Sequence, residues 1–342
     1  MIEVSKYQLQ QNPEQSPLFS IIIPCYNVER YLRDTMISIL SQNFSDFDVI
    51  AVNDGSTDAT LALLQDIARG DERVRVISQN NAGVSVARNV GLANATGTYV
   101  CFFDGDDLMP QGTLRYCAEA VTRHPFVDLF CLGYTAHVST TGGEQQYVCH
   151  KIDECEFESE QALRLFLQRK LYIHIGSFFC RRSLINLSKI QFLSGCKIGE
   201  DIRYILQMLQ HVHKIYYSSR ISFIYQIHND TVMCGYRQVY PEHCEIFNAY
   251  QLDVSYLPNL QLDYNRFLAI SYISLLVRYL RFSRPSSAVE KLLLKYKYLL
   301  NNPVDFLSTQ GFLIKCVKLL PINKMFVVKK IIWRNKPNAG SK

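Results

Sequence analysis

The chain lacks the features that mark membrane-spanning proteins and disulfide-bonded secreted proteins. Its longest apolar stretch in a helical pattern, residues 267–280, is too short to cross a bilayer and contains Arg278. Residues 1–17 are polar and rich in glutamine, without the basic start and apolar core of a secretory signal, so we expect a loose leader. The 11 cysteines include no CxxC pair, which favours free thiols in a reducing cytosol over disulfides or zinc sites.

Acidic residues are absent from the end of the sequence. The net charge is +5, yet no Asp or Glu follows Asp305, whereas eight basic residues do. Removing these eight charges from the total leaves −3 for the rest of the chain. They are Lys315, Lys318, Lys324, Lys329, Lys330, Arg334, Lys336 and Lys342.

Apolar residues from Phe312 to Trp333 are interspersed among these basic residues. The mixture is typical of a basic amphipathic tail that lies on an anionic membrane surface. A core helix with a solvated basic side, or a partner-binding helix, would have the same composition. No nucleic-acid-binding motif accompanies the charge, so we expect no nucleic acid as a partner.

What the sequence does contain is a regular alternation of strand and helix patterns. Unbroken apolar runs alternate with helical spacing from residue 19 to residue 103. This alternation predicts a parallel sheet with helices on its faces. The expected strands are 19–25, 48–52, 74–78 and 99–103, and the expected helices are 28–41, 59–69 and 84–94.

The pattern loosens beyond Pro110. We expect helices at 111–123, 159–171 and 202–211, extended segments at 127–134, 178–180 and 215–225, and a loop or hairpin at 140–155. From residue 240 the pattern is helical, with breaks at Pro258, Pro285, Pro303 and Pro321.

Three carboxylates, Asp104, Asp106 and Asp107, follow the strand expected at 99–103, and Gly105 lets the backbone turn. The strand end places them at the carboxyl edge of the sheet, where ligands bind in open α/β folds. Carboxylates this close repel one another unless a cation or strong donors offset them, and Mg²⁺ or Mn²⁺ suits oxygen ligands. A solvated acidic turn is the alternative. An EF-hand is excluded, because Met109 stands where that loop requires glycine.

Two other turns carry polar residues with more than one interpretation. In the turn 53–58, Thr57 or Asp58 can cap the following helix. Gly83 permits close backbone approach just before a helix whose N-terminus attracts phosphate. Arg88, on the second turn of that helix, can reach phosphate or a carboxylate of the DGDD turn, or form a surface ion pair.

Four stretches together resemble the family 2 inverting glycosyltransferases of the GT-A fold. They are IIIPCYNVERYL (21–32), VNDGSTDAT (52–60), NNAGVSVARNVGLANATGTYVCFFDGDD (80–107) and GED (199–201). The resemblance implies a GT-A domain at 18–235, with a Rossmann-like mixed α/β sheet flanked by helices. It leaves 236–342 as a helical C-terminal region with a basic amphipathic tail.

The resemblance also implies roles for individual residues. Asp104 and Asp106 of the DxD motif would hold the metal, and Asp201 would be the base that takes the acceptor's proton. Glu200 would bind the acceptor hydroxyl or act as a charge at the helix end, as acidic residues do at any helix N-terminus. The expected donor-binding residues are Pro24, Tyr26, Asn27, Asp54 (at the uracil ring), Gly83, Arg88, Asp104, Gly105 and His228. Gln226 departs from the arginine that often stands there.

These implications predict a Mn²⁺- or Mg²⁺-dependent inverting glycosyltransferase, a hexosyl- or N-acetylhexosaminyltransferase. The expected donor is a UDP-sugar, and the acceptor is a glycan or lipid-linked glycan in bacterial surface-polysaccharide synthesis. We expect a cytoplasmic protein, peripheral on the inner face of the membrane. Two alternatives are a non-catalytic nucleotide-sugar-binding assembly partner and an aspartyl-phosphate phosphohydrolase. The hydrolase fits less well, because Asp107 occupies the Thr/Val position of its motif.

Overall fold

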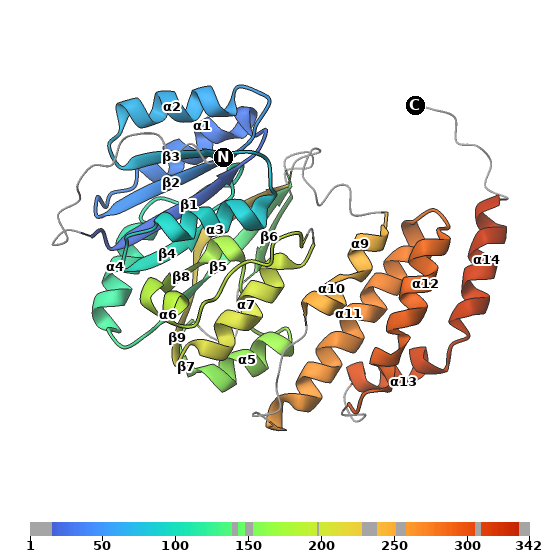
Figure 1. Cartoon of the computed structure of the whole chain (residues 1–342). Helices are drawn as coiled ribbons and strands as arrows, with labels where there is room; N and C mark the ends of the chain where they lie inside the picture. Colours follow the sequence, from blue (N-terminus) through green and yellow to red (C-terminus); the bar gives the residue numbers. More distant parts are fainter. Residues whose placement is uncertain are drawn as a thin grey trace. The chain divides into compact units, whose positions relative to one another are not determined.

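The chain divides into two compact units, residues 1–228 and residues 229–342, in a computed structural model (Figure 1). The structure describes residues 16–138, 143–147, 153–196, 198–227, 238–250, 258–304 and 309–334. The predicted domain boundary at 235/236 and nearly all of the predicted leader lie outside these ranges.

The first half of unit 1 is a parallel sheet with helices on both faces. Strands β1 (Phe19–Cys25), β2 (Phe47–Asp54), β3 (Val74–Gln79) and β4 (Tyr99–Phe102) lie side by side in the order β3-β2-β1-β4. The helices between them are α1 (Glu29–Leu40), α2 (Thr60–Gly70) and α3 (Val84–Asn94). The predicted alternation over 19–103 is confirmed, and Asp58 accepts a hydrogen bond from the Thr60 N–H at the start of α2.

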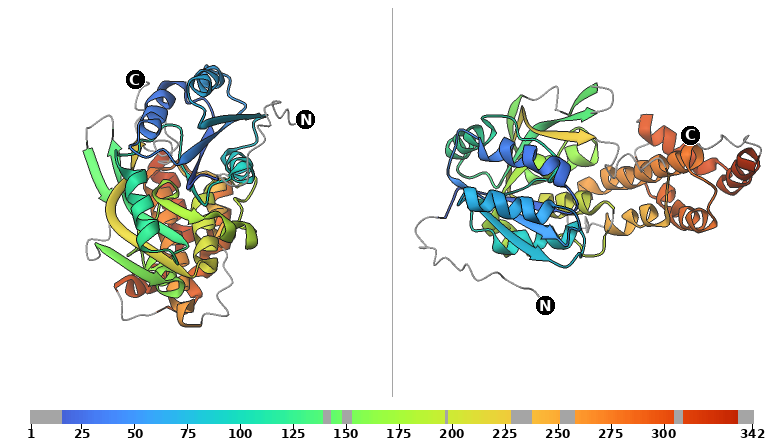
Figure 2. Two further views of the ribbon diagram at one scale, coloured as in Figure 1. Left: turned by 90° about the vertical axis from the view of Figure 1, so that its left-hand side faces the viewer. Right: turned by 90° about the horizontal axis from the view of Figure 1, so that it is seen from above.

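Side-chain alternation along β1 decides which helix covers which face. Ile21 and Ile23 pack in one cluster with residues of α1 and α2, whereas Ile22 points to the opposite face. There α3 approaches so closely that a Cβ on Gly91 would lie 2.3 Å from Ile22 Cγ2. Glycine at this position lets α3 lie against the sheet, which brings its N-terminal turn to the carboxyl ends of β1 and β2 (Figure 2).

The second half of unit 1 makes the sheet mixed. Strand β8 (Phe178–Arg181) pairs antiparallel with β4 and with β5 (Leu129–Val138), and β9 (Lys214–Ile227) runs parallel to β5. Strand β7 (Glu154–Glu158) lies beside β9, and β6 (Gly143–Tyr147) beside β5. The other elements are α4 (Thr113–Arg123), α5 (Ser159–Leu167), η1 (Ile175–Ser177), α6 (Arg182–Leu187) and α7 (Glu200–His211).

This topology confirms the predicted mixed sheet flanked by helices. Strand β6 pairs antiparallel with β5, in agreement with the hairpin alternative expected within 140–155. One detail differs from the prediction, because α5 ends at Leu167 instead of residue 171.

Unit 2 is helical, as predicted. Its elements are α9 (Pro241–Cys244), α10 (Ile246–Ala249), η2 (Pro258–Leu260), α11 (Gln261–Phe282), α12 (Ser287–Tyr296), η3 (Lys297–Asn301), α13 (Thr309–Leu319) and α14 (Ile322–Arg334). Tyr279 of α11 donates a hydrogen bond to Glu290 of α12 at 2.9 Å, and Lys330 of α14 pairs with the same carboxylate at 2.5 Å. Among the described residues, no helix combines the length and apolar character needed to span a membrane.

Candidate active site

The loops that follow β1 and β2 are tied together at the carboxyl edge of the sheet. Pro24 is buried within β1, and Tyr26, just beyond the strand, is 49% exposed. Asn27 takes a left-handed φ of 53°, and its Oδ1 accepts a hydrogen bond from the Thr57 N–H at 2.8 Å. The Asn27 N–H donates in turn to Ser56 Oγ at 3.1 Å. Asn27 therefore joins the loop after β1 to the loop after β2, and the Tyr26 ring remains exposed at the carboxyl edge of the sheet.

Asp54, at the end of β2, orders the loop that leads into α3. Its side chain is buried, and Oδ1 accepts hydrogen bonds from Gln79 Nε2 at 2.7 Å and from the Ala82 N–H at 2.8 Å. Oδ2 accepts from the N–H of Gly83 at 2.9 Å. Gly83 has a φ of 90°, which favours glycine at this turn. The contact of Asp54 with a uracil ring stays a prediction, and the loop-ordering role is an addition from the structure.

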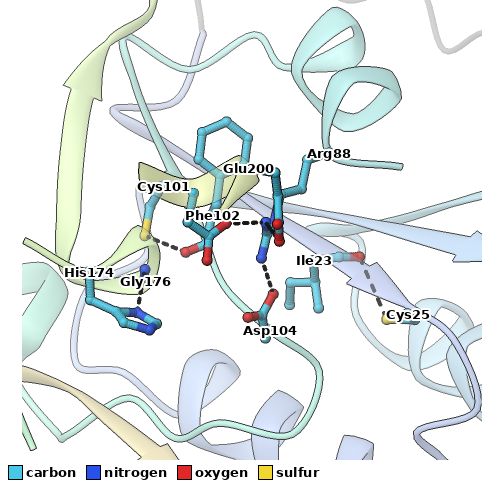
Figure 3. A network of polar contacts seen from close by, with 10 residues as sticks. Ile23, Cys25, Arg88, Cys101, Phe102, Asp104, His174, Gly176 and Glu200 are labelled. Carbon is cyan, nitrogen blue, oxygen red and sulfur yellow. Dashed lines mark hydrogen bonds and ion pairs between the residues drawn. The ribbon is translucent and has the colours of Figure 1, made fainter. Parts of the chain in front are cut away.

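Arg88 of α3 joins the DxD motif to the Glu-Asp pair, and Figure 3 shows its guanidinium next to Asp104 and Glu200. Its side chain is 2% exposed; Nη2 donates to Asp104 Oδ1 at 2.9 Å and Nη1 donates to Asp201 Oδ1 at 2.6 Å. Glu200 Oε1 lies 3.7 Å from Nη1, and the Phe192 ring lies 5.2 Å from the guanidinium carbon. Burial alone would lower the pKa of Arg88, but the three carboxylates raise it overall. The guanidinium therefore stays charged and compensates the carboxylates around it.

Glu200 and Asp201 occupy the first turn of α7, where the helix dipole favours negative charge. Gly199 caps the helix with a φ of 80°. The two side chains differ in environment, because Glu200 is 14% exposed and Asp201 is 34% exposed. Burial and the charge of Asp201 raise the pKa of Glu200 to about 7. Asp201 is therefore the carboxylate of the pair that is more open to an incoming molecule.

The DGDD turn, which follows β4 in the chain, concentrates negative charge. Burial and the charge of Asp104 raise the pKa of Asp106 to about 6. Asp107 is fully buried; its Oδ1 accepts a hydrogen bond from the Gln226 N–H at 2.8 Å, and its Oδ2 has no partner among the described residues. The carbonyl oxygen of Gly105 accepts a hydrogen bond from Thr35 Oγ1 at 3.1 Å, which holds the turn against α1.

A divalent cation fits this turn only if other molecules complete its coordination. Within the described ranges, no three or more His, Cys, Asp or Glu side chains are grouped to hold a metal ion. Asp106 and Asp104 are the carboxylates that would hold the ion. Mg²⁺ or Mn²⁺ commonly takes one or two carboxylates plus substrate phosphates. A cation would also relieve the repulsion that raises the pKa of Asp106.

The structure adds His174 to the site and leaves His228 outside the described residues. His174 precedes η1, and its ring accepts a hydrogen bond from the Gly176 N–H (Figure 3). The charges of Asp201, Asp104 and Arg88 act on the pKa of this ring. No motif in the sequence points to it, because its neighbours come from strands that are distant in the chain.

Comparisons with known proteins agree with this geometry. The family model described as glycosyl transferase family 2 matches residues 20–187. The uncharacterized glycosyltransferase EpsJ of Bacillus subtilis (strain 168) is 28% identical over 245 residues, which is 70% of this chain and 70% of EpsJ. An uncharacterized glycosyltransferase of Haemophilus influenzae is 28% identical over 218 residues, 62% of this chain and 80% of that protein.

A solved structure shares the fold of the chain. The crystal structure of residues 1–349 of S. aureus TarS, in complex with UDP-GlcNAc, covers 92% of this chain and 91% of its own, with a TM-score of 0.65 and 20% identity. The mixed sheet of unit 1, flanked by helices, thus has the GT-A fold. Residues 20–187, which include the first three of the four motif stretches, therefore match glycosyl transferase family 2.

Proposed function

We propose that this glycosyltransferase works with inversion and uses a divalent metal and a UDP-sugar donor. The observation that carries the proposal is the position of Arg88, which binds Asp104 of the DxD motif and Asp201 of the Glu-Asp pair with one guanidinium. A donor held at the DxD motif and a base on α7 would then lie on two sides of the Arg88 guanidinium. Inverting transfer needs such a base beside the donor.

Asp201 is the general base of the proposed reaction. The acceptor oxygen forms a bond to the anomeric carbon while the bond from that carbon to the diphosphate breaks, and the acceptor's proton passes to Asp201. Arg88 orients the Asp201 carboxylate through the 2.6 Å hydrogen bond. Glu200, whose pKa is about 7, is partly protonated at neutral pH and offers a hydrogen bond to the acceptor hydroxyl.

Asp106, with Asp104, would hold Mn²⁺ or Mg²⁺. When bound, the cation would act as a Lewis acid on the charge that develops on the leaving diphosphate. The raised pKa of Asp106 and the unpartnered Asp107 Oδ2 support a cation here, because both report uncompensated negative charge at the turn.

Tyr26, Asp54 and Gly83 line the proposed nucleotide side of the site. Support for a UDP-sugar comes from TarS, whose structure contains UDP-GlcNAc. Support for an acceptor in surface-polysaccharide synthesis comes from the minor teichoic acid biosynthesis protein GgaB of Bacillus subtilis (strain 168). It is 29% identical over 217 residues, although that match covers only 23% of GgaB. We therefore propose transfer of a hexosyl or N-acetylhexosaminyl group to a glycan or lipid-linked glycan.

UDP binding measured by calorimetry, with and without Mn²⁺, tests the donor and metal assignments. We expect Mn²⁺ to tighten UDP binding about tenfold or more, because an ion held by Asp106 and Asp104 would offset the negative charge of the diphosphate. Asp106→Asn should remove this gain. Asp66→Asn on α2, a carboxylate that is 62% exposed and far from the motif in sequence, is the control and should keep it. Absence of UDP binding in both conditions would overturn the donor class.

We further propose that unit 2 holds the enzyme on the inner face of an anionic membrane. Helix α13 buries Ile314 and Val317, yet a second apolar stripe on it is exposed. Lysines on the same helix are exposed next to this stripe and complement anionic headgroups. The stripe consists of Phe312, Leu313, Cys316, Leu319 and Leu320, and the lysines are Lys315 and Lys318.

Co-sedimentation with vesicles tests the membrane proposal. We expect the full chain to bind vesicles that contain phosphatidylglycerol, and the double variant Lys315→Glu, Lys318→Glu to bind at least about tenfold more weakly. The matched control changes Lys291 and Lys295 of α12 to glutamate, which alters the net charge equally on another helix of the same unit. Equal losses in both double variants, or equal binding to neutral phosphatidylcholine vesicles, would contradict a role for α13.

A further inference from the structure

His174 belongs to a cluster of aromatic rings that the proposed transfer chemistry does not use. Its ring stacks on Phe223 of β9, with centroids 4.6 Å apart and an interplanar angle of 23°. The rings of Tyr134 on β5 and Tyr225 on β9 lie 5.1 Å and 5.4 Å from it. Phe223 is fully buried, whereas the other three are partly exposed. The three partly exposed rings therefore form an aromatic surface, and the buried Phe223 ring lies beneath it.

This aromatic cluster adjoins the DxD motif through β9. The N–H of Gln226 donates to Asp107 Oδ1, and Ile224 exchanges backbone hydrogen bonds with Leu108 at 2.9 and 3.1 Å. Tyr225 lies between these two attachment points. Strands β5 and β9 belong to the second half of the sheet, whereas the motifs expected to bind the nucleotide follow β1 and β2. The cluster is thus next to the reaction centre, on the side away from those motifs.

The His174 ring offers one fixed hydrogen-bond donor to this surface. Its Nδ1 accepts a hydrogen bond from the Gly176 N–H at 3.2 Å, so the neutral ring carries its proton on Nε2. Burial lowers the pKa of His174 and keeps the ring neutral, although Asp201 and Asp104 act in the opposite direction. No described residue accepts a hydrogen bond from Nε2.

The local backbone holds this ring in place. The His174 N–H donates to Ser177 Oγ at 3.1 Å, and the Ser177 hydroxyl donates back to the His174 carbonyl oxygen at 3.1 Å. A Cβ on Gly176 would lie 2.4 Å from a Phe223 ring carbon, so glycine lets η1 approach β9 closely enough for the stack. A ring fixed by packing and by two backbone contacts suits recognition better than a mobile one.

We propose that His174, Tyr134 and Tyr225 form the subsite for the acceptor sugar. A pyranose would lay its C–H face on the aromatic rings, and one of its hydroxyls would accept a hydrogen bond from His174 Nε2. Sites of this kind combine an apolar wall with a few placed polar groups. The cluster contacts the DGDD turn through β9 and lies on the side of the sheet away from the loops after β1 and β2, which makes it the acceptor side. The inference rests on the proposed glycosyltransferase reaction and adds the sugar-recognising residues to it.

Ligand-observed saturation-transfer NMR on the full chain, with UDP and Mn²⁺ present, tests the subsite. The probes are methyl N-acetyl-β-D-glucosaminide and methyl β-D-glucopyranoside at millimolar concentration. We expect binding of at least one glycoside, and we expect His174→Phe, which keeps a ring but loses the donor, to weaken it about fivefold to tenfold. His174→Gln, whose amide N–H reaches near the Nε2 position, should retain more of the affinity than His174→Phe.

Two further variants separate recognition from folding. His124→Phe is the matched control, because the His124 ring also packs against an aromatic ring of unit 1, that of Tyr216 at 4.6 Å. This variant should leave glycoside binding unchanged. Tyr225→Leu removes stacking surface without altering the Gly176 contact, and it should weaken glycoside binding while UDP affinity stays within about twofold.

The outcomes distinguish this inference from the proposed function. If the wild type binds UDP but neither glycoside, or if His174→Phe and Tyr225→Leu bind as the wild type does, the subsite is wrong. If both variants lose UDP and glycoside together, the cluster serves the donor or the fold. Failure of the wild type to bind UDP would instead overturn the proposed function itself.

Discussion

Asp201→Asn is expected to lower the rate of glycosyl transfer by about 10²–10⁴-fold, because an amide cannot take the proton of the acceptor hydroxyl. The asparagine Oδ1 can still accept the hydrogen bond that Asp201 receives from Arg88 at 2.6 Å. The site should therefore keep its shape, and UDP affinity should stay within about twofold of the wild type. Sugar transfer and UDP binding, measured on the same preparation, check both halves of this expectation.

Glu200→Gln is the matched control for that experiment, because the two carboxylates lie in the same turn of α7 and face the same guanidinium. With a pKa of about 7, Glu200 is partly protonated at neutral pH, and glutamine resembles its protonated form. We expect less than about a tenfold loss of turnover. A larger loss in Glu200→Gln than in Asp201→Asn would assign the base to Glu200. Full activity in Asp201→Asn would remove the base from α7 altogether.

Much of the sheet follows from local sequence, and the exceptions have a physical cause. Strands β1 and β4 are buried on both faces, so their unbroken apolar runs stand out from the flanking helical patterns. Strand β6, with the sequence GEQQY, carries no apolar alternation, so its sequence fits a loop as well as a hairpin strand. Its pairing with β5, off the main path of the sheet, depends on the neighbouring strand rather than on its own residues.

Some residues of the candidate site also follow from local sequence, whereas others are brought together only by the fold. The position of Arg88 on α3 predicts contact with phosphate or with a carboxylate of the DGDD turn, and the structure brings it to Asp104. Its second partner, Asp201, is 113 residues away, and only the packing of α7 near α3 brings the two together. His174 carries no local signal, because its stacking partner Phe223 lies on a different strand. Local patterns identified motifs, whereas contacts between motifs required the fold.

Arg88→Met is expected to destabilise unit 1 by about 3–5 kcal/mol, because it leaves Asp104, Glu200 and Asp201 without the buried cation that pairs with them. For a unit of this size the melting temperature should fall by about 10 °C or more. Arg75→Met is the control, because Arg75 is 37% exposed and its pair with Asp48 contributes about 0–1 kcal/mol. Thermal unfolding followed by circular dichroism measures both.

The dependence of this loss on pH shows whether charge or shape is responsible. Arg88 lowers the pKa of Glu200, so without the guanidinium this pKa should rise further above its unfolded value. The folded variant then binds more protons than the unfolded chain, so its stability falls as pH rises through the raised pKa. The difference between Arg88→Met and the wild type should accordingly be smaller at pH 5 than at pH 8. Equal differences at both pH values would mean that Arg88 stabilises unit 1 through its packing against Phe192 rather than through its charge.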